Sequence, residues 1–354
     1  MKTVFSEITP SELGFHMPAE WQRQEAIWLS WPHNEETWPG IFDRIPNVYS
    51  EIVYHLSQNQ VVKINVKDAD HEKVVRDILS KANANLKAIK FYQIPTNDTW
   101  CRDHGPTFFI KNDTGVNEKA LINWQFNSWG GKYPFELDNA VPESILKFEN
   151  CKFFNPGIVM EGGSIEVNGA GSVLTTKACL LNHNRNPHLN QSQIEDYLKA
   201  YLGVKQVLWL EDGILGDDTN GHIDDLSRFV NENTIVTILE ADSSDENYEI
   251  LRENMQLLKG MRNLHGKPFD IITLPMPEPI IFQSERLPAS YANFLIANKL
   301  VLVPIFQDKN DKVAIELLQK CFPDRKVVGI NCRDLVAGLG TLHCISQQEP
   351  SLSI

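Results

Sequence analysis

The strongest constraint on the fold is the alternation of short apolar runs with stretches of helical periodicity along the chain. The apolar runs, which are typical of buried strands, lie at residues 26–31, 61–66, 91–94, 206–210, 234–239, 270–274, 301–306 and 327–330. The stretches with helical periodicity lie near residues 45–57, 69–84, 137–147, 190–202, 245–259 and 310–321. Strands that alternate with helices predict an α/β protein.

The chain shows no sign of a division into separate domains. Its length of 354 residues would allow about two domains. However, no low-complexity tract, charged tail or flexible linker interrupts the sequence. We therefore expect residues 1–354 to form one compact unit. Asn190, followed three residues later by Gln193, predicts a capped helix start.

Four polar clusters, each of which follows a predicted strand, recur at nearly equal spacing. Asp103 lies 58 residues before Glu161, and Glu161 lies 61 residues before His222. Cys344 follows His222 by 122 residues, which is twice 61. This spacing indicates a unit of about sixty residues with one silent unit near residue 280. A radial or solenoid arrangement, in which equivalent loops meet, is favoured over coincidence.

The charge balance limits the class of partner. The chain has 33 Lys and Arg against 46 Asp and Glu, so its formal net charge is −13. This argues against nucleic-acid binding, which depends on clustered cations, and favours a small cationic partner. No run of 18 apolar residues is present, which predicts no membrane span. The six dispersed cysteines predict reduced thiols in the cytoplasm and no thiolate metal site.

The segment from Gly216 to Asp225 contains four carboxylates, one His and two Gly within ten residues. A solvated acidic loop is one interpretation, and a calcium loop is disfavoured because the ligand register and the distal Glu are missing. A reactive site explains the density better. If His222, Ile223 and Asp224 are extended, His222 and Asp224 face the same side and Asp225 faces away.

Three further segments contain residues able to do chemistry. Residues 100–106 end in a Gly-Pro turn signal, and there Arg102 could pair with Asp103 or with another neighbour. Residues 160–163 place Glu161 before two glycines, where the backbone can approach another group closely. In the third segment Cys344 follows His343, and adjacent residues of a strand face opposite sides. His222 is therefore the better candidate base for Cys344, although a lone Cys in such a run is usually core packing.

Together, these segments closely resemble the agmatine deiminase family, which also includes bacterial peptidylarginine-deiminase-type enzymes. The motifs that carry the resemblance are Trp100-x-Arg102-Asp103-x-Gly-Pro106, Glu161-Gly-Gly163, Asn220-Gly-His222-x-Asp224 and His343-Cys344-x-x-Gln347-Gln348-x-Pro350. Matches at residues 14–21, 185–188, 289–294 and 322–329 extend the resemblance over nearly the whole chain. It implies a pentein fold, a five-bladed α/β propeller of ββαβ units with pseudo-fivefold symmetry and the site at its centre.

The resemblance also implies roles for particular residues. Cys344 would be the nucleophile that forms a thiouronium intermediate, and His222 would be the acid and then the base. Glu161 would orient His222, while Asp103 and Asp224 would hold the guanidinium nitrogens. Such carboxylates suit a planar cation, because bidentate hydrogen bonds match its geometry. The remaining substrate-binding candidates are Trp100, which would line the channel for the aliphatic stem, Asp218 and Gly340.

The implied reaction converts agmatine to N-carbamoylputrescine and ammonia, a step of putrescine biosynthesis, without metal or cofactor. Two alternatives stay open: an enzyme acting on peptidylarginine or free arginine, and a non-catalytic pentein that only binds. A homo-oligomer is compatible with either. One segment departs from the family, whose Gly-Gly-Gly-Asn run reads Gly338-Leu339-Gly340-Thr341 here. If the middle position needs positive φ, Leu339 is strained.

Overall fold

The strands of the computed structural model form small sheets that share one plan. The structure describes residues 3, 5, 7–113 and 116–352. The strands are β1 (Gln24–Ser30), β2 (Val61–Val66), β3 (Ile89–Gln93), β4 (Thr107–Asp113), β5 (Val116–Ile122), β6 (Lys152–Phe154), β7 (Glu166–Val167), β8 (Ser172–Thr176), β9 (Gln206–Leu210), β10 (Ser227–Asn231), β11 (Thr234–Leu239), β12 (Asp270–Pro275), β13 (Ile281–Phe282), β14 (Glu285–Arg286), β15 (Leu295–Ala297), β16 (Leu300–Ile305), β17 (Lys326–Asn331) and β18 (Ser346–Pro350). The pairs and their directions repeat from sheet to sheet.

Four sheets follow the same order, which is β4-β5-β6, β7-β8-β9, β10-β11-β12 and β15-β16-β17. In each, the first two strands are antiparallel and the third is parallel to the second. A parallel pair needs a crossover, and helices supply it between the second and third strands. This is the ββαβ unit that the pentein resemblance implies.

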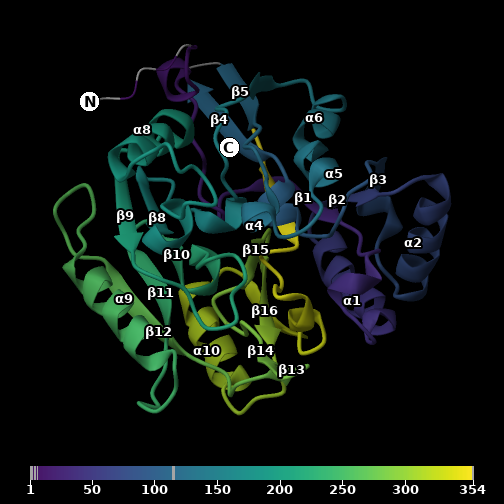
Figure 1. Cartoon of the computed structure of the whole chain (residues 1–354). Coiled ribbons are helices and arrows are strands. Elements are labelled where there is room, and N and C mark those ends of the chain that lie inside the picture. Colours follow the sequence, from purple (N-terminus) through teal and green to yellow (C-terminus); the bar gives the residue numbers. More distant parts are fainter. Residues whose placement is uncertain (1–2, 4, 6, 114–115, 353–354) are drawn as a thin grey trace.

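Helices cross over within the units and lie outside the strands. Figure 1 shows α2, α8, α9 and α10 around the rim of the molecule, each beside the strands of its own unit. The α-helices are α1 (Ile45–Ser57), α2 (Ala69–Lys81), α3 (Cys101–His104), α4 (Ser128–Gly131), α5 (Glu136–Asn139), α6 (Val141–Leu146), α7 (Lys177–Leu180), α8 (Gln191–Leu202), α9 (Tyr248–Gly260) and α10 (Asp311–Cys321). No helix in the described ranges has the length and apolar character that crossing a bilayer would require.

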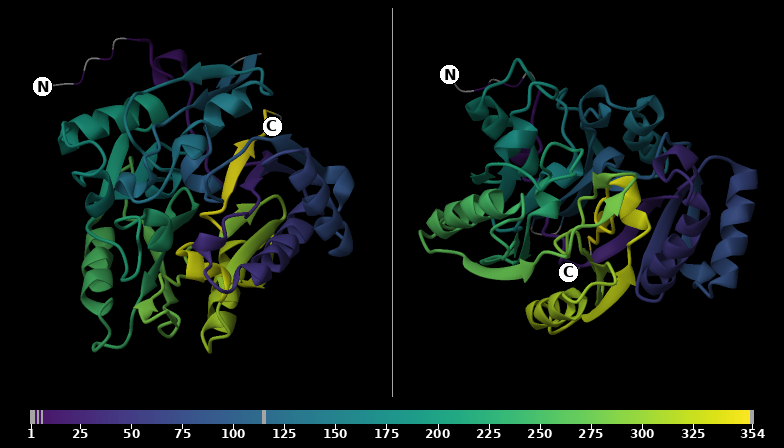
Figure 2. Two further views of the ribbon diagram at one scale, coloured as in Figure 1. Left: turned by 45° about the vertical axis from the view of Figure 1, so that its right-hand side comes forward. Right: turned by 60° about the horizontal axis from the view of Figure 1, so that its bottom comes forward.

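The fifth sheet joins the two ends of the chain. Its order is β18-β1-β2-β3, with β18 antiparallel to β1 and β2 parallel to β1. Figure 2 shows the yellow C-terminal strand beside the purple N-terminal segment. The first unit is therefore completed by the last strand, which closes the ring of units.

The closing strand β18 is polar, yet each of its residues is buried. Glu349 accepts hydrogen bonds from Trp28 Nε1 at 2.8 Å and from Lys63 Nζ at 2.7 Å, and it also pairs with Lys119. Burial alone would raise the pKa of Glu349, but the two lysines hold it below its usual range. A buried ion cluster therefore fixes this strand in place of apolar packing.

Most of the predicted elements are confirmed, with shifts of a few residues at their ends. The capped helix start at Asn190 is confirmed, because its side chain accepts from Gln193 N and Gln193 reaches back to Asn190 N. The helix predicted over 137–147 is divided into α5 and α6, and Pro142 opens the second. The helix predicted over 69–84 ends at Lys81, two residues before Asn83 turns left-handed at φ 58°.

Candidate active site

The chemistry-bearing segments occupy equivalent places in successive units. Asp103 lies in α3 before β4, and Glu161 caps the short 3₁₀ helix Gly162–Ser164 before β7. His222 caps a second 3₁₀ helix, Ile223–Asp225, before β10, and Cys344 lies in a turn before β18. The spacing of about sixty residues thus arises because each segment connects the end of one unit to the first strand of the next.

Gly163 shows how tightly three of these segments meet. A methyl group at this position would lie 2.6 Å from His222 Nδ1, 2.9 Å from Asp103 Oδ1 and 3.1 Å from Asp224 Oδ2. No real side chain fits at those distances, so glycine is required here because of close approach. The expectation that the two glycines after Glu161 allow such an approach is confirmed.

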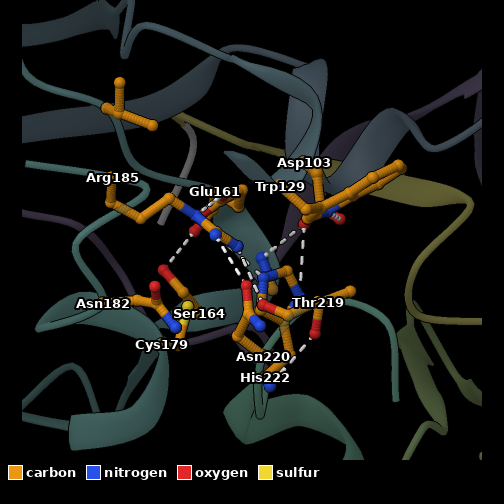
Figure 3. A network of polar contacts seen from close by, with 12 residues as sticks. Asp103, Trp129, Glu161, Ser164, Cys179, Asn182, Arg185, Thr219, Asn220 and His222 are labelled. Carbon is orange, nitrogen blue, oxygen red and sulfur yellow. Dashed lines mark hydrogen bonds and ion pairs between the residues drawn. The ribbon is translucent and has the colours of Figure 1, made fainter. Parts of the chain in front are cut away.

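Asp103 is buried and held by two donors. Its Oδ1 accepts from Gly163 N at 2.9 Å, and its Oδ2 accepts from Trp129 Nε1 at 3.0 Å (Figure 3). Burial, together with the nearby Asp224 and Glu161 carboxylates, raises the pKa of Asp103 to about 8. A bound cation would reverse that effect, because an opposite charge favours the ionised carboxylate. Arg102 does not pair with Asp103; its Nη1 donates to Gln348 Oε1 at 2.6 Å.

His222 lies between two carboxylates without a hydrogen bond to either. Its Nδ1 is 3.8 Å from Asp103 Oδ1, and its Nε2 is 4.0 Å from Glu161 Oε2. Neither ring nitrogen has a hydrogen-bond partner among the described residues. Burial lowers the pKa of His222 to about 3, although Asp224 opposes the shift. The imidazole is therefore neutral and has both nitrogens free for proton transfer.

Arg185 holds the Glu161 segment against the His222 segment, a contact that sequence reasoning did not assign. Its Nε donates to Glu161 Oε1 at 2.5 Å, and its Nη2 donates to Thr219 O at 2.8 Å. Nη1 reaches Asn220 Oδ1 at 2.9 Å (Figure 3). Burial raises the pKa of Glu161 even so. The match at residues 185–188 was the only sequence signal for this residue.

The acidic loop contains a structural carboxylate as well as reactive ones. Asp217 Oδ2 accepts from Gly221 N at 2.9 Å and from His222 N at 3.0 Å, and Oδ1 accepts from Thr219 N at 2.7 Å. Asp217 therefore shapes the turn that presents His222. Two expectations about this loop are wrong: Ile223–Asp225 is a 3₁₀ helix, so residues 222–224 are not extended, and Asp225 does not face away.

Cys344 lies beside the carboxylates of that 3₁₀ helix. Its Sγ is 3.9 Å from Asp224 Oδ2, and Asp224, Asp225 and Cys344 present ligand atoms within 4.8 Å of one another. Burial, followed by Asp224, Asp225 and Asp103, raises the pKa of the Cys344 thiol well above its usual range. The free site therefore holds a thiol, and a cationic ligand would favour the thiolate.

His343 also reaches Asp224, which corrects the strand geometry expected for residues 341–346. Residues 342–345 form a turn, and the strand begins only at Ser346. His343 Nδ1 lies 2.6 Å from Asp224 Oδ2, the same oxygen that faces Cys344, and Nε2 lies 3.0 Å from Glu20 Oε2. His343 therefore contacts Asp224 directly and helps to position its carboxylate.

The unit that appeared silent near residue 280 contributes Asn293, which precedes β15. The side chain is fully buried, and its Nδ2 donates to Cys344 Sγ at 3.0 Å and to Asp225 Oδ1 at 3.0 Å. Asn was not identified because its side chain does not titrate and its segment, residues 289–294, had no charged cluster.

Trp100 and the loop before Cys344 pack against each other. A methyl group at Gly340 would lie 2.5 Å from the Trp100 ring and 3.0 Å from Cys344 Cβ. Leu339 has φ 71°, so the left-handed conformation suspected for this departure from the family is confirmed. Both Gly340 and Trp100 therefore lie beside the nucleophile candidate.

Asp218 lies apart from the buried groups, at a partly exposed rim. Its Oδ1 pairs with Lys132 Nζ at 2.7 Å, and its Oδ2 accepts from Tyr133 OH at 2.8 Å. The Tyr133 and Trp129 rings pack edge to face with their centroids 6.0 Å apart, and Trp129 Nε1 donates to Asp103. A row of contacts therefore links Asp218 to the buried centre.

Within the described part of the chain, three groups of side chains are close enough to share a metal ion: Glu161, Cys179 and His222; Glu20, Glu166 and His343; and Asp224, Asp225 and Cys344. Protein cations already balance the charge of the first two, because Arg185 pairs with Glu161 and Arg228 pairs with Glu20 and Glu166. The arrangement is suited to a cation with several N–H donors, since Asp103 and Asp224 both border the space around His222 and Cys344.

Comparison with known proteins agrees with this geometry. The family model for the Porphyromonas-type peptidyl-arginine deiminase matches residues 16–350. An agmatine deiminase from Medicago truncatula is 38% identical, with 98% of this chain and 99% of that protein covered.

Solved structures show the same relationship. The agmatine deiminase of Enterococcus faecalis superposes with a TM-score of 0.91 at 34% identity, covering 99% of this chain and 100% of that one. A C. jejuni agmatine deiminase with substrate bound gives 0.85 at 37% identity, covering 95% and 96%. The expected fold class is confirmed, and the chain belongs to the Porphyromonas-type peptidyl-arginine deiminase family.

Proposed function

We propose that this protein hydrolyses the guanidinium group of agmatine to N-carbamoylputrescine and ammonia. The observation that carries the proposal is that a buried thiol, a neutral imidazole with two unpartnered nitrogens and two carboxylates lie side by side. The agmatine deiminases that the chain resembles over nearly its full length point to the same reaction.

The substrate cation would bind between Asp103 and Asp224. In the free site Asp103 tends to keep a proton, because its pKa is raised to about 8. A guanidinium supplies planar N–H donors that suit ionised carboxylates, so its binding would favour loss of that proton. The same positive charge would favour the Cys344 thiolate. Recognition and activation would therefore occur together.

The first half-reaction would form the covalent intermediate. The Cys344 thiol gives its proton to neutral His222, and the sulfur adds to the central guanidinium carbon. The carbon–sulfur bond forms, and the adduct is tetrahedral and uncharged. His222 then gives the proton to the departing nitrogen as the carbon–nitrogen bond breaks. Ammonia leaves, and an S-alkylthiouronium cation stays on Cys344. Glu161 would stabilise the His222 imidazolium formed between these steps.

The second half-reaction would release the product. His222 takes a proton from water, and the hydroxide adds to the thiouronium carbon. The carbon–sulfur bond breaks as the new hydroxyl loses its proton and becomes the carbonyl of N-carbamoylputrescine. Cys344 recovers its proton from His222. The hydroxyl proton converts the released ammonia to ammonium, so atoms and charge balance.

The rim favours a substrate that carries an amine at its far end. Asp218, which pairs with Lys132 in the free protein, would exchange that partner for the amine, and Trp100 would contact the aliphatic stem between the two ends. A free arginine would instead bring a carboxylate, which usually pairs with an Arg. Three arginines near the site are already bonded: Arg102 to Gln348, Arg185 to Glu161, and Arg228 to Glu20 and Glu166. The net charge of −13 also favours the dication.

Side-by-side measurement of ammonia release from agmatine, free arginine and a blocked arginine peptide tests this function. We expect kcat/KM for agmatine to exceed the values for free arginine and the arginine peptide by at least roughly tenfold. The agmatine amine would pair with Asp218, a contact that the two arginine substrates would not make. Faster turnover of either arginine substrate would instead support the alternative that the enzyme acts on peptidylarginine or free arginine. No turnover of any of the three would support a binding module.

Two further expectations accompany this function. We expect residues 1–354 to act as one catalytic domain, because the site residues come from successive units along the chain. We also expect the enzyme to work in the cytoplasm, where its six free cysteines would stay reduced.

A further inference from the structure

Both ends of the Asn293 side-chain amide make hydrogen bonds near Cys344. Its Oδ1 accepts from Thr341 Oγ1 at 2.8 Å and from His343 N at 3.0 Å, and Cys344 N lies 3.4 Å away. Its Nδ2 lies 3.0 Å from Cys344 Sγ. One side chain thus binds both the backbone of the turn and the sulfur that the turn presents.

The orientation of the amide follows from these contacts. A backbone N–H can only donate, so the amide end facing His343 N must be the carbonyl oxygen. The end facing Cys344 Sγ and Asp225 must then be the NH₂ group. Asn293 is also fully buried, so water does not compete for either end. The N–H therefore points at the sulfur as a fixed donor.

The surroundings of the sulfur make such a donor important. Asp224 and Asp225 face Cys344 from the 3₁₀ helix, and Asp103 faces it from α3. These carboxylates and the burial all disfavour a negative sulfur, and His343, the preceding residue, is directed at Asp224. The backbone of Thr341 is a second donor close to the sulfur. Hydrogen bonds to a charged group stabilise it more than bonds to a neutral one.

We propose that Asn293 is a catalytic residue of this site, which donates its side-chain N–H to the Cys344 thiolate and fixes the sulfur for attack. The residue comes from the segment before β15, so the unit for which the sequence predicted no ionisable site residue contributes a neutral donor. This inference rests on Cys344 being the nucleophile proposed above.

The test compares the pH dependence of Cys344 alkylation in three proteins. An uncharged reagent, iodoacetamide, is used, and the modified Cys344 peptide is quantified by mass spectrometry. Asn293→Leu replaces the amide by an uncharged side chain of similar shape, so it loses the N–H that faces the sulfur without adding a charge. Thr341→Val is the matched control, since it removes a contact to Asn293 Oδ1 and keeps the N–H donor.

We expect Asn293→Leu to move the midpoint of the alkylation profile upward by roughly one to two pH units, the size of a lost hydrogen bond to a charged group. The alkylation midpoint of Thr341→Val should stay within about 0.3 pH unit of the wild-type midpoint, because the sulfur keeps its donor. The acid limb of kcat/KM should move with the alkylation midpoint. If Asn293→Leu does not fold, Asn293→Ala, which also lacks the donor and adds no charge, takes its place with the same expected shift.

Three results would overturn the inference: an unchanged midpoint in the Asn293 variants, an equal shift in Thr341→Val, or failure of both Asn293 variants to fold. Each would mean that the amide only holds the turn. Alkylation of Cys344 is measured without substrate turnover, so this test does not depend on whether the proposed function is correct. A failure of the proposed function is detected by a different measurement. That failure would appear as a Cys344→Ser protein that still releases ammonia at the wild-type rate.

Discussion

At the scale of single residues, burial makes each protonation state depend on neighbouring groups. Cys344 is 7% exposed, Asp103 is 6% exposed and His222 is 1% exposed. Water therefore contributes little to stabilising charge, and the pKa values of these groups move in different directions. The thiol and Asp103 keep their protons, while His222 stays neutral. Such a site is arranged for a ligand that brings its own positive charge.

Replacement of the nucleophile is the first prediction at this scale. Cys344→Ser should abolish ammonia release, because an unassisted hydroxyl is a far weaker nucleophile than a thiolate. Circular dichroism should show an unchanged fold, since the two side chains have nearly the same shape. A haloacetamidine should inactivate the wild-type protein and add its mass to Cys344. Labelling of another residue, combined with full activity of Cys344→Ser, would exclude the assignment.

The acid–base assignment gives the second prediction. His222→Ala should lower kcat by roughly 10²–10⁴-fold, the usual contribution of general acid–base catalysis. The affinity for substrate should change less, because Asp103 and Asp224 stay in place. Steady-state kinetics on the folded variant provide the measurement. Retention of more than a tenth of wild-type kcat would show that another group transfers the proton.

The third prediction concerns His343, which in the strand expected from the sequence would face away from Cys344 and contribute only packing. The contact of 2.6 Å between Nδ1 and Asp224 changes that expectation. Hydrogen bonding from His343 offsets burial and keeps the pKa of Asp224 below its usual range. His343→Ala should therefore weaken cation binding and lower kcat/KM by roughly ten- to a hundredfold.

The loss in His343→Ala should appear mainly in KM and should grow as the pH falls, because Asp224 would then protonate more easily. His343→Gln, which can still donate to Asp224, should recover part of it. Activity of His343→Ala within twofold of wild type at every pH would restore the interpretation as packing.

At the scale of elements, short turns before the first strand of each unit position the reactive groups. These segments meet so closely that some positions have no room for a Cβ. Gly163 is the clearest case, because its backbone N–H bonds Asp103 while its Cα faces His222. The turn before β7 thus serves two neighbouring units at once.

Gly163→Ala should lower kcat/KM by at least roughly a hundredfold, since displacement of catalytic groups by about 1 Å has that effect. Gly260→Ala is the matched control, because nothing lies within 4 Å of the added methyl and it should leave activity unchanged. Ammonia release and thermal melting of both variants provide the measurement. Wild-type activity in a folded Gly163→Ala would show that the segments can separate without cost.

At the scale of the whole molecule, the last strand closes the ring of units by pairing with the first. Its buried Glu349 is paired with Lys63 and Lys119, so the closure depends on charge as well as backbone hydrogen bonds. Cys344, the proposed nucleophile, lies in the turn directly before this strand. Loss of the closure would therefore disturb the nucleophile as well as stability.

Glu349→Gln should lower the free energy of unfolding by roughly 1.5–3 kcal/mol at neutral pH, because Lys63 and Lys119 each lose one carboxylate but keep Glu149 and Glu25. The folded pKa of Glu349 lies below its unfolded value, so its stabilisation is present above the ordinary carboxyl range and is lost as pH falls through it. The difference between wild type and Glu349→Gln in denaturant unfolding should shrink from pH 7 to pH 3. A difference that does not depend on pH would exclude this role of the charge.

Local pattern alone was enough to predict the alternation of strands and helices, since apolar periodicity reports burial within a few residues. It also predicted the cap at Asn190, whose partner Gln193 is three positions away. The polar strand β18 could not be predicted in this way. Its burial depends on Lys63 and Lys119, which are distant in sequence, so no local pattern marks Ser346–Pro350 as a strand.

The site shows the same division. The titratable types and their spacing of about sixty residues predicted Asp103, Glu161, His222 and Cys344 as site residues, because each segment lies at the same place in its repeated unit, and the acidic loop added Asp224. Only the tertiary structure showed that Arg185 clamps Glu161, that His343 bonds Asp224 and that Asn293 faces the sulfur. These contacts join residues 24, 119 and 51 positions apart. A sequence determines which groups are available, while the directions in which their side chains point depend on how the units pack around them.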